Sequence, residues 1–114
     1  MKRSIEHTGR LIALLLKRGG GNRARVSEAT VCKLSGRPRL RSAFKEELRK
    51  ELDDLGLLFV EIDPGGFGLQ RLSTLNGAPA LTAKKYMSDL KKLTIEKAEN
   101  ELEIDWLEDE QDAE

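Results

Sequence analysis

Residues 41–62, RSAFKEELRKELDDLGLLFVEI, join the clearest amphipathic pattern of the sequence to a run of mostly apolar residues. Four apolar residues of this stretch recur at spacings of four, four and three, which places them on one face of a helix. They are Phe44, Leu48, Leu52 and Leu55. Gly56 follows at the position where glycine commonly ends a helix. The stretch therefore predicts a helix that begins near Arg41 or Ser42, ends at Leu55 and packs one face against a core.

A strand, a turn and a second strand are predicted directly after this helix. Residues 57–62 are Leu, Leu, Phe, Val, Glu and Ile, a composition that favours a strand. The sequence Asp63-Pro64-Gly65-Gly66 is a strong turn signal, and residues 67–73 supply the returning strand. This pattern predicts a β-hairpin.

Two helices are predicted upstream. The first runs from Ser4 to Arg18 and ends at the glycines 19–21, because three consecutive glycines disfavour a continued helix. Its apolar stripe consists of Ile5, Ile12, Leu15 and Leu16, widened by Leu11 and Leu14. The second runs from about Glu28 to Leu34, with Ser27 as its N-cap and Ala29 and Cys32 on one face. Residues 22–26 are expected to form either a loop or one short strand.

The order of these elements resembles the winged helix-turn-helix superfamily. The resemblance covers residues 4–75 and is carried by residues 27–36, residues 41–55 and the hairpin that closes at Thr74. Within it, residues 51–58, ELDDLGLL, are especially similar to a recognition helix that enters the wing. The resemblance implies an α+β, mainly helical fold, in which a winged helix with a three-helix core and a two-stranded wing precedes an additional C-terminal helix.

What the resemblance implies for function is binding to double-stranded DNA, with the third predicted helix in the major groove and the wing near the backbone. The basic and polar residues around that helix are the expected contacts, because cations neutralise phosphates and arginine commonly binds guanine. These residues are Arg37, Arg39, Arg41, Ser42, Lys45, Arg49 and Lys50, with Arg23, Arg25 and Arg71 as further backbone contacts. The alternative for the arginines of the turn is a solvated surface loop. Glu46, Glu47 and Glu51 oppose DNA binding, because carboxylates repel phosphates.

The net charge of zero hides a strong asymmetry along the chain. Residues 1–95 contain 19 Lys and Arg against 10 Asp and Glu, and residues 96–114 contain one Lys against 10 acids. A basic body with an acidic tail favours an anionic partner for the body. It also leaves open a protein–protein interaction module in a larger complex, with a tail that contacts a partner or restrains DNA binding.

Three segments are expected along the chain: a winged-helix domain over residues 1–75, a helix over residues 76–100 and an acidic, partly disordered tail over residues 101–114. The middle helix is a candidate homodimerisation element, or it packs on its own domain. Its apolar face consists of Tyr86, Met87, Leu90 and Leu93. Trp106 is a candidate anchor for a partner or a cover for the domain's own core.

Catalysis is not indicated by the sequence. His7 is the only histidine and Cys32 the only cysteine, so neither a zinc site nor a nucleophile–histidine pair is expected, and no cofactor is implied. The longest apolar run, Leu11–Leu16, is too short for a membrane span. We therefore expect a cytoplasmic DNA-binding protein that is not an enzyme, such as a transcriptional regulator or a DNA-associated accessory protein, acting as a homodimer.

Overall fold

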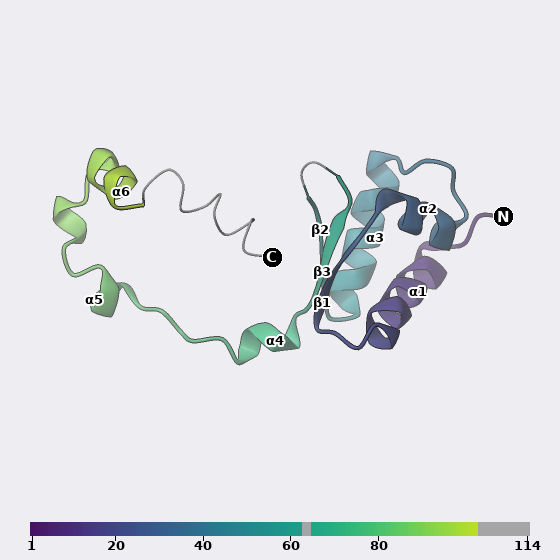
Figure 1. Cartoon of the computed structure of the whole chain (residues 1–114), viewed down its shortest axis with the longest axis horizontal. Coiled ribbons are helices and arrows are strands. Elements are labelled where there is room, and N and C mark those ends of the chain that lie inside the picture. Colours follow the sequence, from purple (N-terminus) through teal and green to yellow (C-terminus); the bar gives the residue numbers. More distant parts are fainter. Residues whose placement is uncertain (63–64, 103–114) are drawn as a thin grey trace. The chain divides into compact units, whose positions relative to one another are not determined.

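The computed structural model describes residues 1–62 and 65–102 and has an α+β fold that is mainly helical (Figure 1). It divides into a first unit, Met1–Ala78, and a second unit from Pro79 onward. The first unit contains α1 (Ile5–Arg18), β1 (Arg23–Val26), α2 (Glu28–Ser35), α3 (Ser42–Asp54), β2 (Leu57–Glu61), β3 (Phe67–Arg71) and α4 (Ser73–Asn76). The second contains α5 (Ala83–Tyr86), the short 3₁₀ helix η1 (Leu90–Lys92) and α6 (Ile95–Leu102). The order in the first unit is compatible with a winged-helix-like arrangement. Among the described residues, no helix has the length and apolar character needed to cross a membrane.

The predicted starts of α1 and α2 are confirmed by their capping contacts. The Oγ of Ser4 accepts a hydrogen bond from the His7 N–H at 3.0 Å, so α1 begins directly after Ser4. The Oγ of Ser27 accepts from the Thr30 N–H at 3.0 Å and caps α2 in the same way. Each contact satisfies an N–H that has no partner inside its helix.

The core of the first unit lies between α1, α2 and α3 and one face of the sheet (Figure 1). The predicted face of α3 is confirmed for Phe44, Leu48 and Leu52, which are buried. Leu55 is 38% exposed, contrary to the prediction, because α3 ends at Asp54 and the chain turns there.

The buried faces of α1 and α2 differ in part from the predicted stripes, of which Ile12 and Leu16 are confirmed as buried. Thr8, Gly9, Ile12 and Leu16 are the buried residues of α1, whereas Leu14 and Leu15 are exposed. In α2, Val31 and Ser35 are buried and the predicted Ala29 is exposed. In both helices the inner face includes small or hydroxyl-bearing residues, because close helix packing selects for size as well as hydrophobicity.

A three-stranded antiparallel sheet replaces the expected two-stranded wing. The strand order is β1-β3-β2, so β3 pairs with β1 on one side and with β2 on the other. Residues 23–26 therefore form the strand that the sequence left open as an alternative to a loop. Val26 pairs with Phe67 and is buried, which ties this short strand to the core. The returning strand ends at Arg71 and not at the predicted Ser73, because α4 begins at Ser73.

The two faces of the sheet have different surroundings. Leu57, Phe59, Phe67 and Leu69 are buried on the inner face, where the rings of Phe59 and Phe67 stack with centroids 4.6 Å apart. Leu58 and Val60 alternate with these residues and are exposed on the outer face.

The single C-terminal helix that the apolar stripe predicted over residues 76–100 is not found. That part of the chain contains α5, η1 and α6 as separate short elements. Thr82 caps α5 by accepting from the Lys85 N–H at 3.3 Å, and this helix ends at Tyr86. Thr94 then accepts from the Lys97 N–H at 3.3 Å at the start of α6. A second capping threonine within the predicted helix marks a new helix start.

Gly36 allows the N-terminal arm, residues 1–3, to lie against the end of α2. The arm is held by a hydrogen bond of 2.8 Å from the Arg3 N–H to the Ser35 carbonyl, and by the Arg3 guanidinium, which donates to the Leu34 carbonyl at 3.1 Å. Gly36 has a left-handed φ of 71°, and a Cβ atom there would overlap the Met1 carbonyl. Only glycine fits both requirements.

We expect Gly36→Ala to destabilise the first unit more than Gly20→Ala. Gly20 has a similar φ of 75° but nothing within 4 Å of its Cβ position. Gly20→Ala should therefore incur only the left-handed backbone penalty, about 1–2 kcal/mol. Gly36→Ala should add the loss of the arm, visible in urea denaturation and as faster hydrogen exchange at the Arg3 amide. Equal losses for the two variants would show that the arm is not held at Gly36.

Candidate nucleic-acid interface

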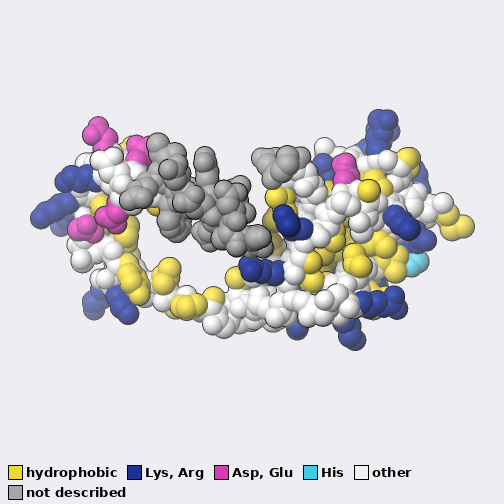
Figure 2. Space-filling model, in the orientation of Figure 1, with side chains coloured by type: hydrophobic (Ala, Val, Ile, Leu, Met, Phe, Trp, Pro, Cys, Tyr) yellow, Lys and Arg dark blue, Asp and Glu magenta, His cyan; other side chains and the backbone are white. Residues whose placement is uncertain are grey.

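The face of α3 opposite its buried residues is exposed, as the sequence predicts. Ser42, Glu46, Arg49 and Lys50 are exposed along it, together with Ala43. On the visible face of the first unit, basic side chains are spread around the edge, with apolar side chains between them (Figure 2). A helix fixed by one face to a core presents its other face in a defined orientation.

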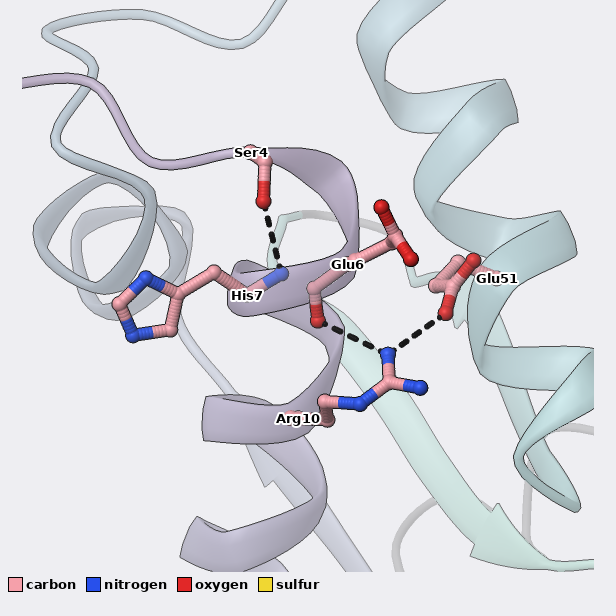
Figure 3. A network of polar contacts seen from close by, with 5 residues as sticks. All are labelled: Ser4, Glu6, His7, Arg10 and Glu51. Atoms are coloured by element: carbon pink, nitrogen blue, oxygen red, sulfur yellow. Dashed lines mark hydrogen bonds and ion pairs between the residues drawn. The ribbon is translucent and has the colours of Figure 1, made fainter.

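Contacts with α1 fix the orientation of α3 (Figure 3). The Nη1 atom of Arg10 donates to the Glu6 carbonyl at 3.1 Å and to Glu51 Oε2 at 2.9 Å. The His7 ring points away from these contacts. Gly9 allows the close approach of the two helices, since a Cβ there would lie 3.0 Å from the Cγ of Glu51. Glu51 is therefore paired with α1, which reduces the repulsion of phosphate expected from this carboxylate.

Glu46 and Arg49 form an ion pair within the exposed face of α3. Arg49 Nη2 lies 2.7 Å from Glu46 Oε2, and Arg49 Nε lies 3.2 Å from Oε1. The hydrogen bonds from Arg49 lower the pKa of Glu46, and the charges of Arg49 and Lys50 act in the same direction. The same contacts raise the pKa of Arg49. The contribution of this pair is thus present above the ordinary carboxyl pKa and is lost as the pH falls through the lowered pKa of Glu46.

A groove runs between α3 and β2, with a volume of about 530 Å³. It is lined by Ser42, Lys45, Glu46, Arg49, Phe59, Val60, Glu61 and Phe67. Within the groove, Lys45 Nζ lies 3.2 Å from the Glu61 carboxylate. Two of the predicted DNA contacts, Lys45 and Arg49, are therefore already paired with carboxylates of the chain.

The three arginines of the turn before α3 have different surroundings. Arg37 is half-buried, stacks on the Phe44 ring at 4.0 Å and donates to the Arg3 carbonyl at 2.9 Å. Arg39 and Arg41 are exposed. Arg37 thus joins the N-terminal arm to α3, whereas Arg39 and Arg41 present their charges to solvent.

A basic cavity of about 410 Å³ lies at this end of α3. It is lined by Lys2, Arg37, Pro38, Arg39, Arg41 and Phe44. The sequence offers no signal for Lys2, which precedes the first helix and shares no periodic pattern with the turn. Its place beside the arginines follows from the path of the N-terminal arm.

The remaining predicted backbone contacts lie on the sheet. Arg23 and Arg25 are exposed on the edge strand β1. Arg71 ends β3 opposite Leu57, the first residue after the C-terminal turn of α3. Its Nη1 donates to the Asn22 Oδ1 at 3.3 Å. Arg71 therefore lies at the opposite end of α3 from Arg39 and Arg41 and does not join their cluster.

The predicted interface residues of the second unit are mostly exposed. Tyr86, Met87 and Leu90 are exposed, and Leu93 is half-buried. Lys85 Nζ lies 5.3 Å from the centroid of the Tyr86 ring. Because α5 ends at Tyr86, these residues do not form one face of a continuous helix. Trp106 lies outside the described residues.

Comparisons with known proteins add no functional assignment to this geometry. No family model matches the sequence, and no match is found among curated proteins or solved structures. The exposed face of α3, the groove beside β2 and the basic cavity are the features on which a functional proposal depends.

Proposed function

We propose that the first unit binds double-stranded DNA through the exposed face of α3 and the cations at the N-terminal end of this helix. One observation carries the proposal: Phe44, Leu48 and Leu52 anchor α3 to the core, and its opposite face is exposed. Arg39 and Arg41, which immediately precede this helix in the chain, are exposed as well. The major groove of DNA is wide enough to accept an α-helix.

The contacts within this interface have different roles. Arg39, Arg41 and Lys50 are exposed and suit phosphates, and Ser42 can donate a hydrogen bond to a phosphate or a base edge. Arg49 must break its ion pair with Glu46 before it can contact a guanine. Arg37 holds the N-terminal arm and stacks on Phe44, so its guanidinium is oriented before any contact with DNA. A regulator or accessory protein that acts as a homodimer on a two-fold site is the form of this function that we favour.

Binding to a fluorescent duplex of random sequence tests the proposal. We expect anisotropy titrations to show binding that weakens roughly a hundredfold between about 50 and 200 mM salt if about four phosphates are neutralised. A single strand of the same length serves as the comparison, since a groove-binding helix should prefer the duplex. Binding that is absent at low salt, or insensitive to salt, would contradict the proposal.

A protein-interaction module is the second candidate, and two observations favour it. The pairs Glu46–Arg49 and Lys45–Glu61 neutralise part of the α3 face. Leu58 and Val60 form an exposed apolar patch on the outer face of the sheet. The duplex titration separates the two candidates, because an adaptor of this kind needs no salt-dependent affinity for DNA.

A further inference from the structure

We propose that the basic cavity at the start of α3 is a phosphate-binding site completed by the N-terminal arm. Residues from two separate segments line it: Lys2 from the arm, and the turn from Arg37 to Arg41. This inference rests on the proposed function only in naming the source of the phosphate, a DNA backbone. The site itself follows from the charges and contacts below.

Within the part of the chain that the structure describes, no carboxylate balances the charge of this cavity. In residues 1–62 and 65–102, none of the four cations, Lys2, Arg37, Arg39 and Arg41, forms an ion pair with a carboxylate. By contrast, Arg10, Lys45 and Arg49 each have a carboxylate partner within 3.2 Å. Four unpaired cations around one concavity repel each other and raise the local concentration of anions. A bound anion relieves this repulsion.

Arg37 is held in place before any ligand arrives. Its Nη1 donates to the carbonyls of Arg3 and Ser35, and its guanidinium lies 4.0 Å from the centroid of the Phe44 ring. A guanidinium has five N–H donors in a rigid plane, so donors remain for an anion after these contacts. A guanidinium that is already held in place loses little conformational freedom when an anion binds, and this favours binding of phosphate.

The first turn of α3 adds to the positive potential beside this cavity. Arg41 is the N-cap residue, and its side chain makes no capping hydrogen bond, so the first N–H groups of α3 have no side-chain acceptor. Such groups carry the positive end of the helix dipole. The helix end strengthens the site, but the four cations define it.

The N-terminal arm brings Lys2 to the cavity. The Met1 carbonyl lies against Gly36, and the arm is held on the other side of Lys2, where the Arg3 N–H donates to the Ser35 carbonyl. Arg37 closes the arrangement by donating to the Arg3 carbonyl. One arginine thus links the arm that supplies Lys2 to the turn that supplies Arg39 and Arg41. Phosphate fits this set better than a carboxylate, because its oxygens can accept from several guanidinium groups at once.

Nuclear magnetic resonance with inorganic phosphate as the probe tests the site in the full chain. Sodium phosphate is titrated against sodium chloride at matched ionic strength, and the backbone amides and arginine Nε–H signals are followed. We expect saturable shifts at Arg37, Arg39, Arg41 and Ser42, and none at Arg18 at the end of α1. In the double variant Arg39→Gln/Arg41→Gln, the affinity for phosphate obtained from these shifts should fall at least fivefold. The double variant Lys17→Gln/Arg18→Gln should bind phosphate like the unmodified protein. Lys2→Gln should also lower the affinity for phosphate, and it leaves the residues of the turn from Arg37 to Arg41 unchanged.

The outcomes distinguish this site from the proposed function. Saturable shifts that the cavity variants weaken support the site. If the same variants also weaken duplex binding, the phosphate is that of a DNA backbone. If the protein does not bind duplex at all, the site takes free phosphate and only the proposed function fails. Shifts that are absent, equally spread over all arginines, or unchanged in the cavity variants overturn the site, even where duplex binding persists.

Discussion

Leu48→Ala is expected to reduce the free energy of unfolding of the first unit by about 2–5 kcal/mol. Leu48 is 0% exposed and lies in the middle of α3, between Phe44 and Leu52 on the buried face. Removing most of its side chain loses apolar contacts and leaves a cavity that close packing cannot fill. At about 0.05–0.15 kcal/mol per residue, the stability of the first unit, Met1–Ala78, is about 4–12 kcal/mol, so the variant should lose a large fraction of it.

Urea denaturation followed by circular dichroism measures this loss, with Leu81→Ala as the matched control. Leu81 is 77% exposed, so the same chemical change there should leave the urea midpoint nearly unchanged. A loss below about 1 kcal/mol for Leu48→Ala would show that α3 is not anchored through this face. The orientation of its exposed face, on which the proposed DNA contact depends, would then have no support.

Ser42→Glu is expected to weaken duplex binding at least about tenfold, or roughly 1.4 kcal/mol, without destabilising the protein. Ser42 is the exposed first residue of α3. A carboxylate in the first turn interacts favourably with the helix dipole, by about 0.3–1 kcal/mol. The same carboxylate would face the phosphates of a docked duplex and cancel part of the charge of Arg39 and Arg41. Stability and affinity should therefore change in opposite directions.

Ser73→Glu is the matched control for this experiment. Ser73 is also exposed and is the first residue of a helix, α4, which follows β3 at the far end of α3 from Ser42. Both variants change the net charge equally, so the difference between their affinities for the duplex in anisotropy titrations reports only the effect of the position of the carboxylate. Equal losses of affinity would assign the effect to net charge. An unchanged affinity for Ser42→Glu would exclude the N-terminal end of α3 from the interface.

The sequence predicted the elements whose signals are local. The helix of α3 follows from the spacing of Phe44, Leu48 and Leu52, and the hairpin follows from the turn signal between two apolar runs. Strand β1 was left open, because Arg23–Val26 has only Ala24 and Val26 as apolar residues and gains its strand structure from pairing with β3. The prediction of one continuous C-terminal helix was wrong, because the spacing of apolar residues does not reveal that a new helix starts after Thr94.

The candidate site was predictable only in part. Placing Phe44 in the core correctly assigned Ser42, Arg49 and Lys50 to the exposed face. No pattern distinguished Arg37 from Arg39, although the first is half-buried against Phe44 and the second is exposed. The ion pair between Lys45 and Glu61 joins a helix to a strand, so no spacing within the helix predicts it.

By itself, the sequence determined where α1 and α2 begin, the end of each of the three helices to within one residue, and which side of α3 is apolar. These properties depend on residues within about one helical turn of each other. Apart from the pair Glu46–Arg49, whose residues are three apart within α3, tertiary structure alone decided which cations are paired and which share a cavity. Arg37 and the Arg3 carbonyl are 34 residues apart in the chain, and Arg10 and Glu51 are 41 apart. Contacts over such separations exist only after the core has brought the helices together, so the charge distribution of the surface is a property of the fold.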